Sequence, residues 1–167
     1  GRDSLLADLI ERMTSPQPTN LALEGLAGIG KTALAVSLAN DSRILEHFTG
    51  GVLWATLGQT PDITAILTRW AEALGLDTTK LPDATSLAGA IKQLSNERKL
   101  LVVFDDVWNL SDVQVLRVAS SDSSYLLTAC QQSIVRSFAN KDLVFSVPTL
   151  TAAAFRLLCQ LAPEACA

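Results

Sequence analysis

The chain contains 167 residues, enough for one domain with its own core, and 49% of them are hydrophobic. This apolar fraction, together with a charged fraction of only 18%, excludes a disordered chain. The 13 basic and 17 acidic residues give a net charge of −4, so the surface has no cationic excess for binding nucleic acid or membrane. No apolar run reaches the roughly 18 residues that predict a membrane span.

Cysteine and histidine usage argues against a zinc site and indicates a reducing compartment. The three cysteines, Cys130, Cys159 and Cys166, lack C-x-x-C spacing, and His47 is the single histidine. The cysteines are interpreted as small core or tail residues with free thiols, which favours a cytoplasmic protein. The start at Gly1 has no signal-peptide pattern and is typical of a segment of a longer protein.

Apolar periodicity predicts the elements of the first half of the chain. A helix over residues 5–13, with Asp3 or Ser4 as its N-cap, is followed by a short strand at 21–23. A helix at 31–40 and a strand at 51–57 come next. A helix that starts at 60–62, with a capping threonine and a proline in the first turn, runs to Leu74 and completes this half, because Gly75 ends it.

The second half alternates strands and helices in the same way. In chain order we predict a helix at 86–94, strands at 100–104 and 125–127, a helix at 133–138, a strand at 143–145 and a helix at 151–161. Residues 100–104 are continuously apolar, as expected for a strand buried on both faces. The alternation predicts an α/β fold whose five-stranded, mostly parallel sheet carries helices on both faces.

A glycine-rich loop carries the strongest chemical signal. Residues 25–32 match G-x-x-x-x-G-K-[ST] in full and lie between a predicted strand and a predicted helix. Glycines let backbone N–H groups approach phosphate oxygens, and the helix directs its positive end toward them. In such a loop the Lys31 ammonium reaches the outer phosphates and the Thr32 hydroxyl binds Mg²⁺. A glycine turn that precedes a lysine by chance is the alternative, but the full match predicts nucleotide binding.

Polar residues follow two of the predicted strands. Asp105 and Asp106 come directly after the most apolar strand, and ligands of open parallel sheets bind at the carboxyl ends of strands. Asp105 is the predicted metal-side acid, and Asp106 the predicted residue that orients or deprotonates an attacking water. Two acids capping a surface strand are the alternative. Thr128 ends the next strand, where its hydroxyl is either a γ-phosphate contact or an ordinary strand-edge group.

Aromatic residues and the histidine are assigned structural roles. Trp70 lies on the apolar stripe of its helix and Trp54 in mid-strand, so both are predicted core residues rather than platforms for adenine. Trp108 follows the acidic pair and is expected to pack beneath the next loop. His47 is placed in a loop, and a single histidine supports no Ser-His-Asp arrangement.

The order of these motifs along the chain resembles that of the NB-ARC nucleotide-binding domain, which belongs to the STAND class of AAA+-like P-loop ATPases. The resemblance is to a bacterial-type member of that class. The segments that carry the resemblance are the opening G-R-[DE] at 1–3, the phosphate loop at 25–35, the second-strand motif at 48–54, the L-L-V-L-D-D-V-W-like stretch at 99–108, the start of L-x-T-T-R at 126–128 and the subdomain entry at 150–151. The resemblance implies a three-layer P-loop NTPase fold for residues 1–149 and the start of a helical subdomain at 150–167.

The resemblance also implies the cofactors ATP or ADP with Mg²⁺. Lys31 and Asp106 are then the predicted catalytic residues, Thr32 and Asp105 the metal ligands, and Arg2 a neighbour of the adenine. The predicted nucleotide-binding residues are Gly25, Leu26, Ala27, Gly28, Ile29, Gly30, Lys31, Thr32, Ala33, Thr128 and Arg2.

By this resemblance the chain is an ATP/ADP-binding switch module of a multidomain signalling protein, with slow Mg²⁺-dependent ATP hydrolysis. ADP would hold a closed form, and ATP an open form that self-associates. Its other implied partners are the effector and repeat-sensor domains of the same chain, without direct nucleic-acid or membrane binding.

One departure from the family keeps alternatives open. Ala129 and Cys130 follow Thr128, where the family carries an arginine that senses the γ-phosphate. A nucleotide-binding domain that acts as an interaction scaffold without hydrolysis is therefore the main alternative. A P-loop small-molecule kinase is a further one, although no arginine cluster occupies a lid-like segment.

Overall fold

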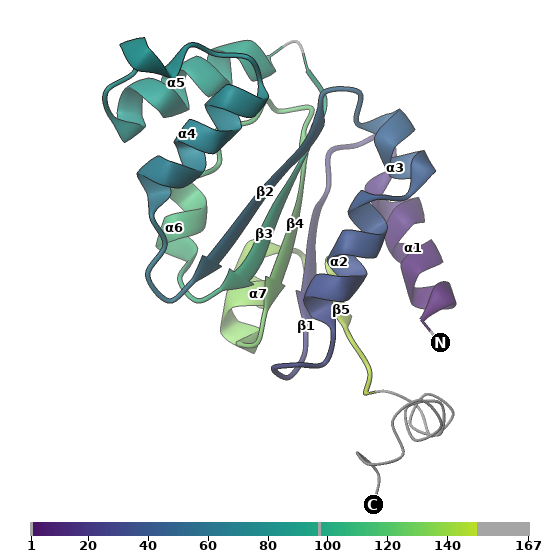
Figure 1. The fold of residues 1–167 in the computed structure, drawn as a ribbon. Coiled ribbons are helices and arrows are strands. Elements are labelled where there is room, and N and C mark those ends of the chain that lie inside the picture. Colours follow the sequence, from purple (N-terminus) through teal and green to yellow (C-terminus); the bar gives the residue numbers. More distant parts are fainter. Residues whose placement is uncertain (1, 97, 150–167) are drawn as a thin grey trace, which may run out of the picture.

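A computed structural model describes residues 2–96 and 98–149 and contains a sheet of five parallel strands in the order β2-β3-β4-β1-β5 (Figure 1). The strands are β1 (Asn20–Glu24), β2 (Gly51–Gly58), β3 (Leu100–Val107), β4 (Ser124–Ala129) and β5 (Val144–Ser146). The predicted five-stranded sheet is confirmed. The first strand in the sequence, β1, lies inside the sheet. After β1 the chain crosses to β2 at the far edge, and β3 and β4 then lie between β2 and β1.

Helices cover both faces of the sheet, as predicted. The α-helices are α1 (Asp3–Met13), α2 (Lys31–Ala39), α3 (Ser42–His47), α4 (Ile63–Ala73), α5 (Ala84–Ser95), α6 (Leu110–Val115) and α7 (Gln132–Phe138), and two 3₁₀ turns are η1 (Thr78–Lys80) and η2 (Lys141–Leu143). Figure 1 shows α1, α2 and α3 on one face and the remaining α-helices on the other. The result is the three-layer α/β architecture expected of a P-loop fold. No helix in the described part of the chain is long and apolar enough to cross a bilayer.

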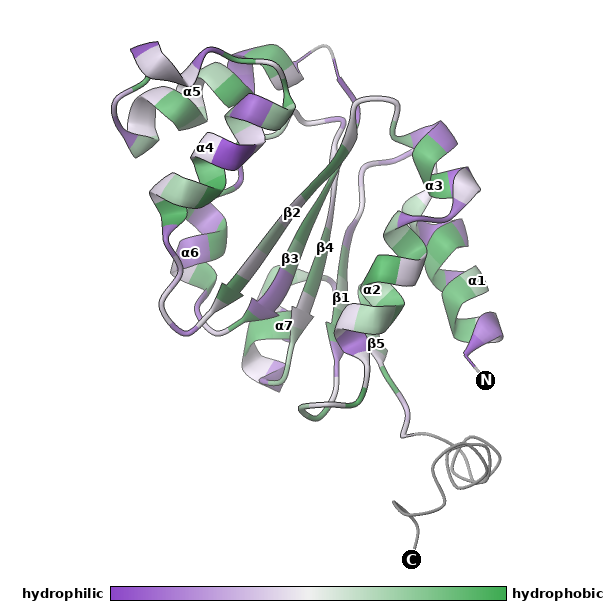
Figure 2. Ribbon diagram, viewed as in Figure 1, coloured by the Kyte–Doolittle hydropathy of each residue, from purple (hydrophilic) through white to green (hydrophobic). Residues whose placement is uncertain are grey.

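Two hydrophobic cores lie on opposite faces of the sheet, and β3 contributes to both. Leu101 and Val103 pack with α1, α2 and α3, whereas Leu100, Val102 and Phe104 pack with the helices of the other face. All five side chains are fully buried, so residues 100–104 form the doubly covered strand that the apolar run predicted. In Figure 2 the strands are hydrophobic along most of their length, and β3 becomes hydrophilic at its carboxyl end.

Strand register brings the polar strand ends to one edge of the sheet. Leu23 of β1 pairs with Thr128 of β4, and Thr56 of β2 pairs with Asp105 of β3. Because every strand is parallel, these carboxyl ends lie together, next to the loop that leaves β1. The fold therefore gathers residues that are distant in the sequence at the edge where ligands of such sheets bind.

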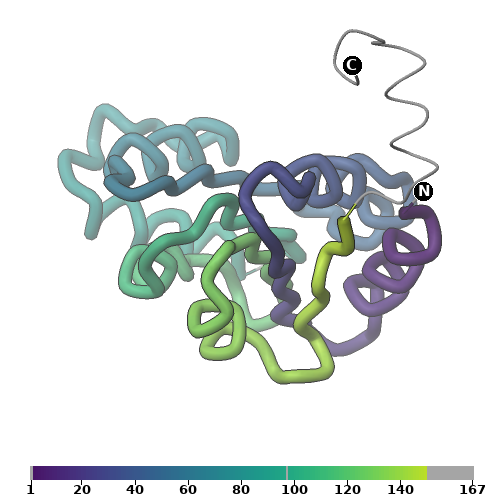
Figure 3. Tube along the Cα trace, turned by 90° about the horizontal axis from the view of Figure 1, so that it is seen from below, coloured from purple at the N-terminus to yellow at the C-terminus, as the bar shows by residue number. Residues whose placement is uncertain are grey.

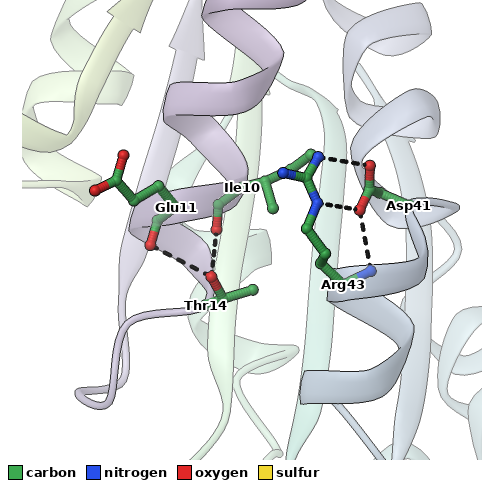
Figure 4. A network of polar contacts seen from close by, with 5 residues as sticks. All are labelled: Ile10, Glu11, Thr14, Asp41 and Arg43. Carbon is green, nitrogen blue, oxygen red and sulfur yellow. Dashed lines mark hydrogen bonds and ion pairs between the residues drawn. The ribbon is translucent and has the colours of Figure 1, made fainter.

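Two helices were not predicted, and the loop assigned to His47 is wrong because His47 is the last residue of α3. This helix has six residues and one buried side chain, Ile44, so it is too short to show an apolar period. Its first turn is held instead by Asp41, whose carboxylate accepts hydrogen bonds from the Arg43 amide and guanidinium (Figure 4). Arg43 correspondingly lowers the pKa of the Asp41 carboxyl. Figure 4 also shows the end of α1, where the Thr14 hydroxyl donates to the Ile10 carbonyl at 2.8 Å.

The other missed helix, α6, also has six residues and a single buried one, Val113. Strand boundaries also differ from prediction: β3 continues to Val107 through the acidic pair, β4 spans Ser124–Ala129, and β5 begins at Val144 after a 3₁₀ turn. The helix α4 begins at Ile63 with Asp62 as its N-cap, later than the start predicted at 60–62. The predicted helix at 151–161 and the subdomain at 150–167 lie outside the described residues.

Candidate functional site

The glycine-rich loop joins β1 to α2 and takes a shape that side chains disfavour. Gly28 has φ +73° and Gly30 has φ +95°, both in the left-handed region that L residues rarely adopt. Gly30 is also the N-cap of α2, and a Cβ there would lie 2.7 Å from Nη1 of Arg2. The backbone angle therefore favours glycine at position 30, whereas the Arg2 guanidinium, at the end of a flexible side chain, could move to admit a Cβ.

Lys31 is buried, with 7% of its surface exposed, and its side chain folds back over the loop. Its ammonium donates to the carbonyls of Gly25 and Leu26, both at 2.9 Å, and to the thiol of Cys130 at 3.2 Å. The cation is thus held inside the loop by two carbonyls and a sulfur, and no carboxylate in this contact set competes for it. An anion entering the loop would meet this charge.

The amino end of α2 offers a second binding element for an anion. The first α-helical hydrogen bond runs from the Leu34 amide to the Gly30 carbonyl at 3.0 Å. The amides of Lys31, Thr32 and Ala33 precede that bond, so they have no partner within the helix. Their N–H groups and the positive end of the helix fit a phosphate group.

A partly buried cluster links the first turn of α2 to the ends of β3 and β4. The Thr32 hydroxyl donates to the Asp105 carboxylate, 2.9 Å from Oδ1 and 3.1 Å from Oδ2. The Thr128 hydroxyl donates to Oδ1 of the same carboxylate at 2.7 Å and accepts the Asp106 amide at 3.0 Å. Asp105 is 3% exposed and Thr128 1% exposed. The carboxylate predicted to lie beside the phosphate loop is therefore in direct contact with it.

Thr32 and Asp105 provide hard oxygen ligands of the kind that Mg²⁺ prefers, so the residues present fit that ion. Within the described residues, no group of three or more His, Cys, Asp or Glu side chains could hold a metal. Two protein ligands suit Mg²⁺, which usually completes its shell with water and phosphate oxygens. The combination of loop, helix end and oxygen pair fits a nucleotide polyphosphate with its metal.

Asp106 differs from its neighbour in both exposure and backbone. Its side chain is exposed, and its φ of 54° is in the left-handed region. Such a conformation is tolerated by aspartate better than by most residues, and it is found at functional sites more often than elsewhere. Asp106 nevertheless lies within β3, which continues to Val107.

Arg2 bonds to main-chain carbonyls. Its guanidinium donates to Ile29 at 2.6 Å, to Gly30 at 3.5 Å and to Pro148 at 2.8 Å. Figure 3 shows the amino end of α1 beside the segment that follows β5. A hollow of about 200 Å³ adjoins this arginine between α1 and α2, and it is lined by Arg2, Asp3, Leu6, Ala33, Leu34 and Ser37. The hollow lies where the adenine was predicted.

A larger hollow of about 620 Å³ lies between the end of β2 and α4. None of its lining residues belongs to the predicted site.

Cys130 is the residue at this site that the sequence interpretation missed. It was expected in the core, but it is exposed, and its thiol contacts the Lys31 ammonium. The departure from the family pattern at position 130 was the available signal, since it marked a residue at the end of β4. Cys159 and Cys166 lie outside the described residues.

The tryptophans and the histidine lie apart from this cluster. Trp70 is 3% exposed and its indole N–H donates to the Trp54 carbonyl at 2.9 Å, which confirms it as a core residue. Trp54 is partly buried against the core on the opposite face of the sheet, so its predicted core position is met only in part. Trp108, which was expected to pack beneath the next loop, has 39% of its surface exposed. His47 lies with Nε2 2.7 Å from Nζ of Lys99.

A family model described as the NB-ARC domain matches residues 2–165. The chain belongs to the NB-ARC family. An NB-ARC domain is a nucleotide-binding domain, and the three-layer fold with its glycine loop is that of P-loop NTPases.

Curated relatives of this NB-ARC domain are much longer proteins. The disease resistance protein RGA2 of Solanum bulbocastanum is 30% identical over 135 residues, covering 76% of this chain and 14% of RGA2. The regulatory protein AfsR of Streptomyces griseus is 24% identical over 137 residues, covering 77% of this chain and 14% of AfsR. The chain thus spans about a seventh of the length of these relatives.

Among solved structures, the Aeropyrum pernix ORC2 protein, determined as ADPNP–ADP complexes, matches with a TM-score of 0.59 at 17% identity. The match covers 96% of this chain and 50% of the ORC2 chain. At this identity the likeness concerns the fold alone.

Proposed function

We propose that this NB-ARC domain binds ATP and ADP with Mg²⁺ and acts as a switch module of a multidomain signalling protein. The observation that carries the proposal is the contact between Thr32 and Asp105, 2.9 Å apart although 73 residues separate them in the sequence. A hydroxyl at the end of a phosphate loop beside a buried carboxylate is the arrangement that holds Mg²⁺ against a nucleotide.

The predicted site residues other than Thr128 each have a role in this proposal. The loop residues Gly25 to Gly30 and the first amides of α2, including that of Ala33, would hold the phosphates, and Lys31 would neutralise their charge. Thr32 and Asp105 would hold Mg²⁺, which when bound offsets charge that develops on the phosphates. Asp106 would orient or deprotonate water, and the hollow beside Arg2 would receive the adenine.

The neighbours in the comparisons support this proposal at different levels. The ORC2 structure is described as ADPNP–ADP complexes, and RGA2 and AfsR are described as disease resistance and regulatory proteins. We propose by analogy that other domains of a longer chain, and self-association in the ATP state, read the nucleotide bound here. The cytoplasmic location favoured by the free thiols stays a prediction.

A second candidate function is nucleotide binding without hydrolysis. Cys130 beside Lys31 favours it, because this position lacks the guanidinium of the arginine that the resembled family pattern carries there. The two candidates differ in Mg²⁺-dependent phosphate release from ATP, which only the first supports. The kinase alternative gains nothing from the site geometry.

Lys31→Met tests the proposed nucleotide site. The substitution removes the ammonium and keeps an unbranched stem in the buried position, so the fold should persist. Calorimetric titration with ADP and ATP should show affinity lowered by about 10- to 100-fold, the expected loss for charge-assisted hydrogen bonds. Lys92→Met, at an exposed lysine of α5, is the matched control and should bind like the wild type. Equal affinity of the two variants would refute the nucleotide site.

A further inference from the structure

The ladder between β3 and β4 ends earlier than the ladders beside it. Pairing of β1 with β4 continues to Glu24 and Ala129, and pairing of β2 with β3 continues to Gly58 and Val107. Pairing of β3 with β4 ends at Phe104 and Leu127. Asp105 and Thr128 would form the next pair in this register. The main-chain pairing of β3 with β4 therefore stops just before Asp105, the first residue of the acidic pair.

The Thr128 side chain fills the gap where the main-chain ladder stops. Its hydroxyl accepts the Asp106 amide at 3.0 Å, a donor that a continuing ladder would have paired with a carbonyl. The single proton of this hydroxyl goes to Oδ1 of Asp105 at 2.7 Å. With 1% of Thr128 exposed, its bond to Asp105 is buried, and its bond from the Asp106 amide is partly buried. The hydroxyl has no second proton to offer a phosphate in this arrangement.

Both members of the acidic pair depend on this hydroxyl. For Asp105 it fixes one carboxylate oxygen, which orients the group that the Thr32 hydroxyl also contacts. For Asp106 it holds the amide of a residue whose φ of 54° is unfavourable without external contacts. One buried side chain on β4 thus controls the direction of the first acid and the backbone of the second.

We infer that Thr128 is a positioning residue that acts through Asp105 and Asp106 rather than on the nucleotide itself. The inference rests on the proposed function, because Asp105 is the proposed Mg²⁺ ligand. The contribution of Thr128 is therefore confined to the part of nucleotide affinity that requires the metal. The part supplied by the phosphate loop and Lys31 does not involve it.

The experiment compares ADP and ATP binding to the 167-residue chain by calorimetry, in Mg²⁺ and in EDTA, for the wild type, Thr128→Val and Thr128→Ser. Thr128→Val keeps the shape and removes the hydroxyl. It should reduce the gain in affinity due to Mg²⁺ by about 10- to 100-fold, as loss of a residue that orients a metal ligand does. Its affinity in EDTA should stay within about twofold of the wild type, and that binding also reports an intact fold. Thr128→Ser, which restores the hydroxyl, should recover the Mg²⁺ gain.

The matched control is Thr56→Val, the same chemical change on the strand at the other side of Asp105. Thr56 is paired with Asp105 in register, but its hydroxyl accepts the Trp54 indole N–H at 3.2 Å. It should behave like the wild type in both conditions.

A second readout requires no metal and no nucleotide. The amide of Asp106 should exchange with solvent faster in Thr128→Val than in the wild type, and at the wild-type rate in Thr128→Ser.

The outcomes separate the two proposals. If Mg²⁺ increases the nucleotide affinity of Thr128→Val as much as that of the wild type, the role of Thr128 is overturned. An equal loss of affinity in Mg²⁺ and in EDTA would overturn it too, because it indicates a structural role only. Failure of the wild type to bind either nucleotide would instead overturn the proposed function, and with it the inference.

Discussion

Asp106 shows how one residue carries both a structural and a chemical demand. Its φ of 54° makes it, among the described residues, the single non-glycine residue with a positive φ. A glycine would take this conformation without a Cβ conflict, yet the chain has a carboxylate there. The backbone cost is therefore accepted at a position where the side chain has a proposed task.

Substitution at position 106 separates these demands. We expect Asp106→Ala to be less stable than Asp106→Gly by about 1–2 kcal/mol, because only alanine meets the left-handed penalty without a compensating side chain. Urea unfolding measures the difference. Both variants lack the carboxylate, so ATP turnover that depends on it should be lost equally in the two.

Asp112, in the first turn of α6, provides the opposite control. There the alanine variant should be the more stable one by about 1 kcal/mol, since glycine is unfavourable in a helix. Equal stabilities of the alanine and glycine variants at position 106 would contradict backbone strain at Asp106.

At the scale of elements, the short helix α3 is tied to the start of β3 by His47 and Lys99. Nζ of Lys99 lies 2.7 Å from Nε2 of His47, and the Phe48 ring packs edge-on against the imidazole with centroids 4.9 Å apart. Partial burial, and secondly the charge of Lys99, lower the pKa of His47 below 6.5. The neutral imidazole is therefore favoured in the folded protein.

Removing the charge of Lys99 should raise the pKa of His47. We expect this in Lys99→Met, although the pKa stays below 6.5 because burial remains the larger cause. An NMR titration of the imidazole measures it without ambiguity, since the chain has one histidine. Lys141→Met, at an exposed position of η2, should leave the titration unchanged. An unchanged or lowered pKa in Lys99→Met would rule out the electrostatic contact.

The same shift sets a pH dependence of stability. The unfolded chain takes up the proton at a higher pH than the folded one, so stability should fall as pH drops below about 6.5 toward the folded pKa of His47. Above 6.5 both states are neutral, and this contribution is fully present.

For the whole molecule, Arg2 is the residue that joins the two ends of the described chain to the candidate site. It bonds to the carbonyls of Ile29 and Gly30 in the phosphate loop and to that of Pro148, 146 residues away. The segment that leaves β5 and the amino end of α1 are therefore fastened to the same loop (Figure 3).

Arg2→Lys should destabilise the protein nearly as much as Arg2→Ala, by about 1–2 kcal/mol. A guanidinium presents donors on three nitrogens in one plane, whereas an ammonium carries all its donors on a single nitrogen. Lysine therefore cannot reach the carbonyls of two segments in the same way. Urea unfolding measures the loss. Arg12→Lys, at an exposed position in the last turn of α1, should have no comparable effect. Wild-type stability of Arg2→Lys would show that charge alone is sufficient.

The sequence by itself determined the fold class, most elements and the residues of the candidate site. The continuous apolar run at 100–104, the alternation of strands and helices and the loop at 25–32 are local patterns, and local patterns follow from period and spacing. The short helices α3 and α6 escaped because six residues with one buried side chain show no period.

Only the tertiary structure decided which of these residues meet. The order β2-β3-β4-β1-β5 places β4 between the strand before the phosphate loop and the strand of the acids, and no local pattern specifies strand neighbours. That order brings Thr128 to Asp105 across 23 residues and Cys130 to Lys31 across 99. The physical reason is that the side-chain pattern of a strand indicates which of its faces is buried. Which strands become neighbours depends instead on the crossover connections, which must cover both faces of the sheet with helices.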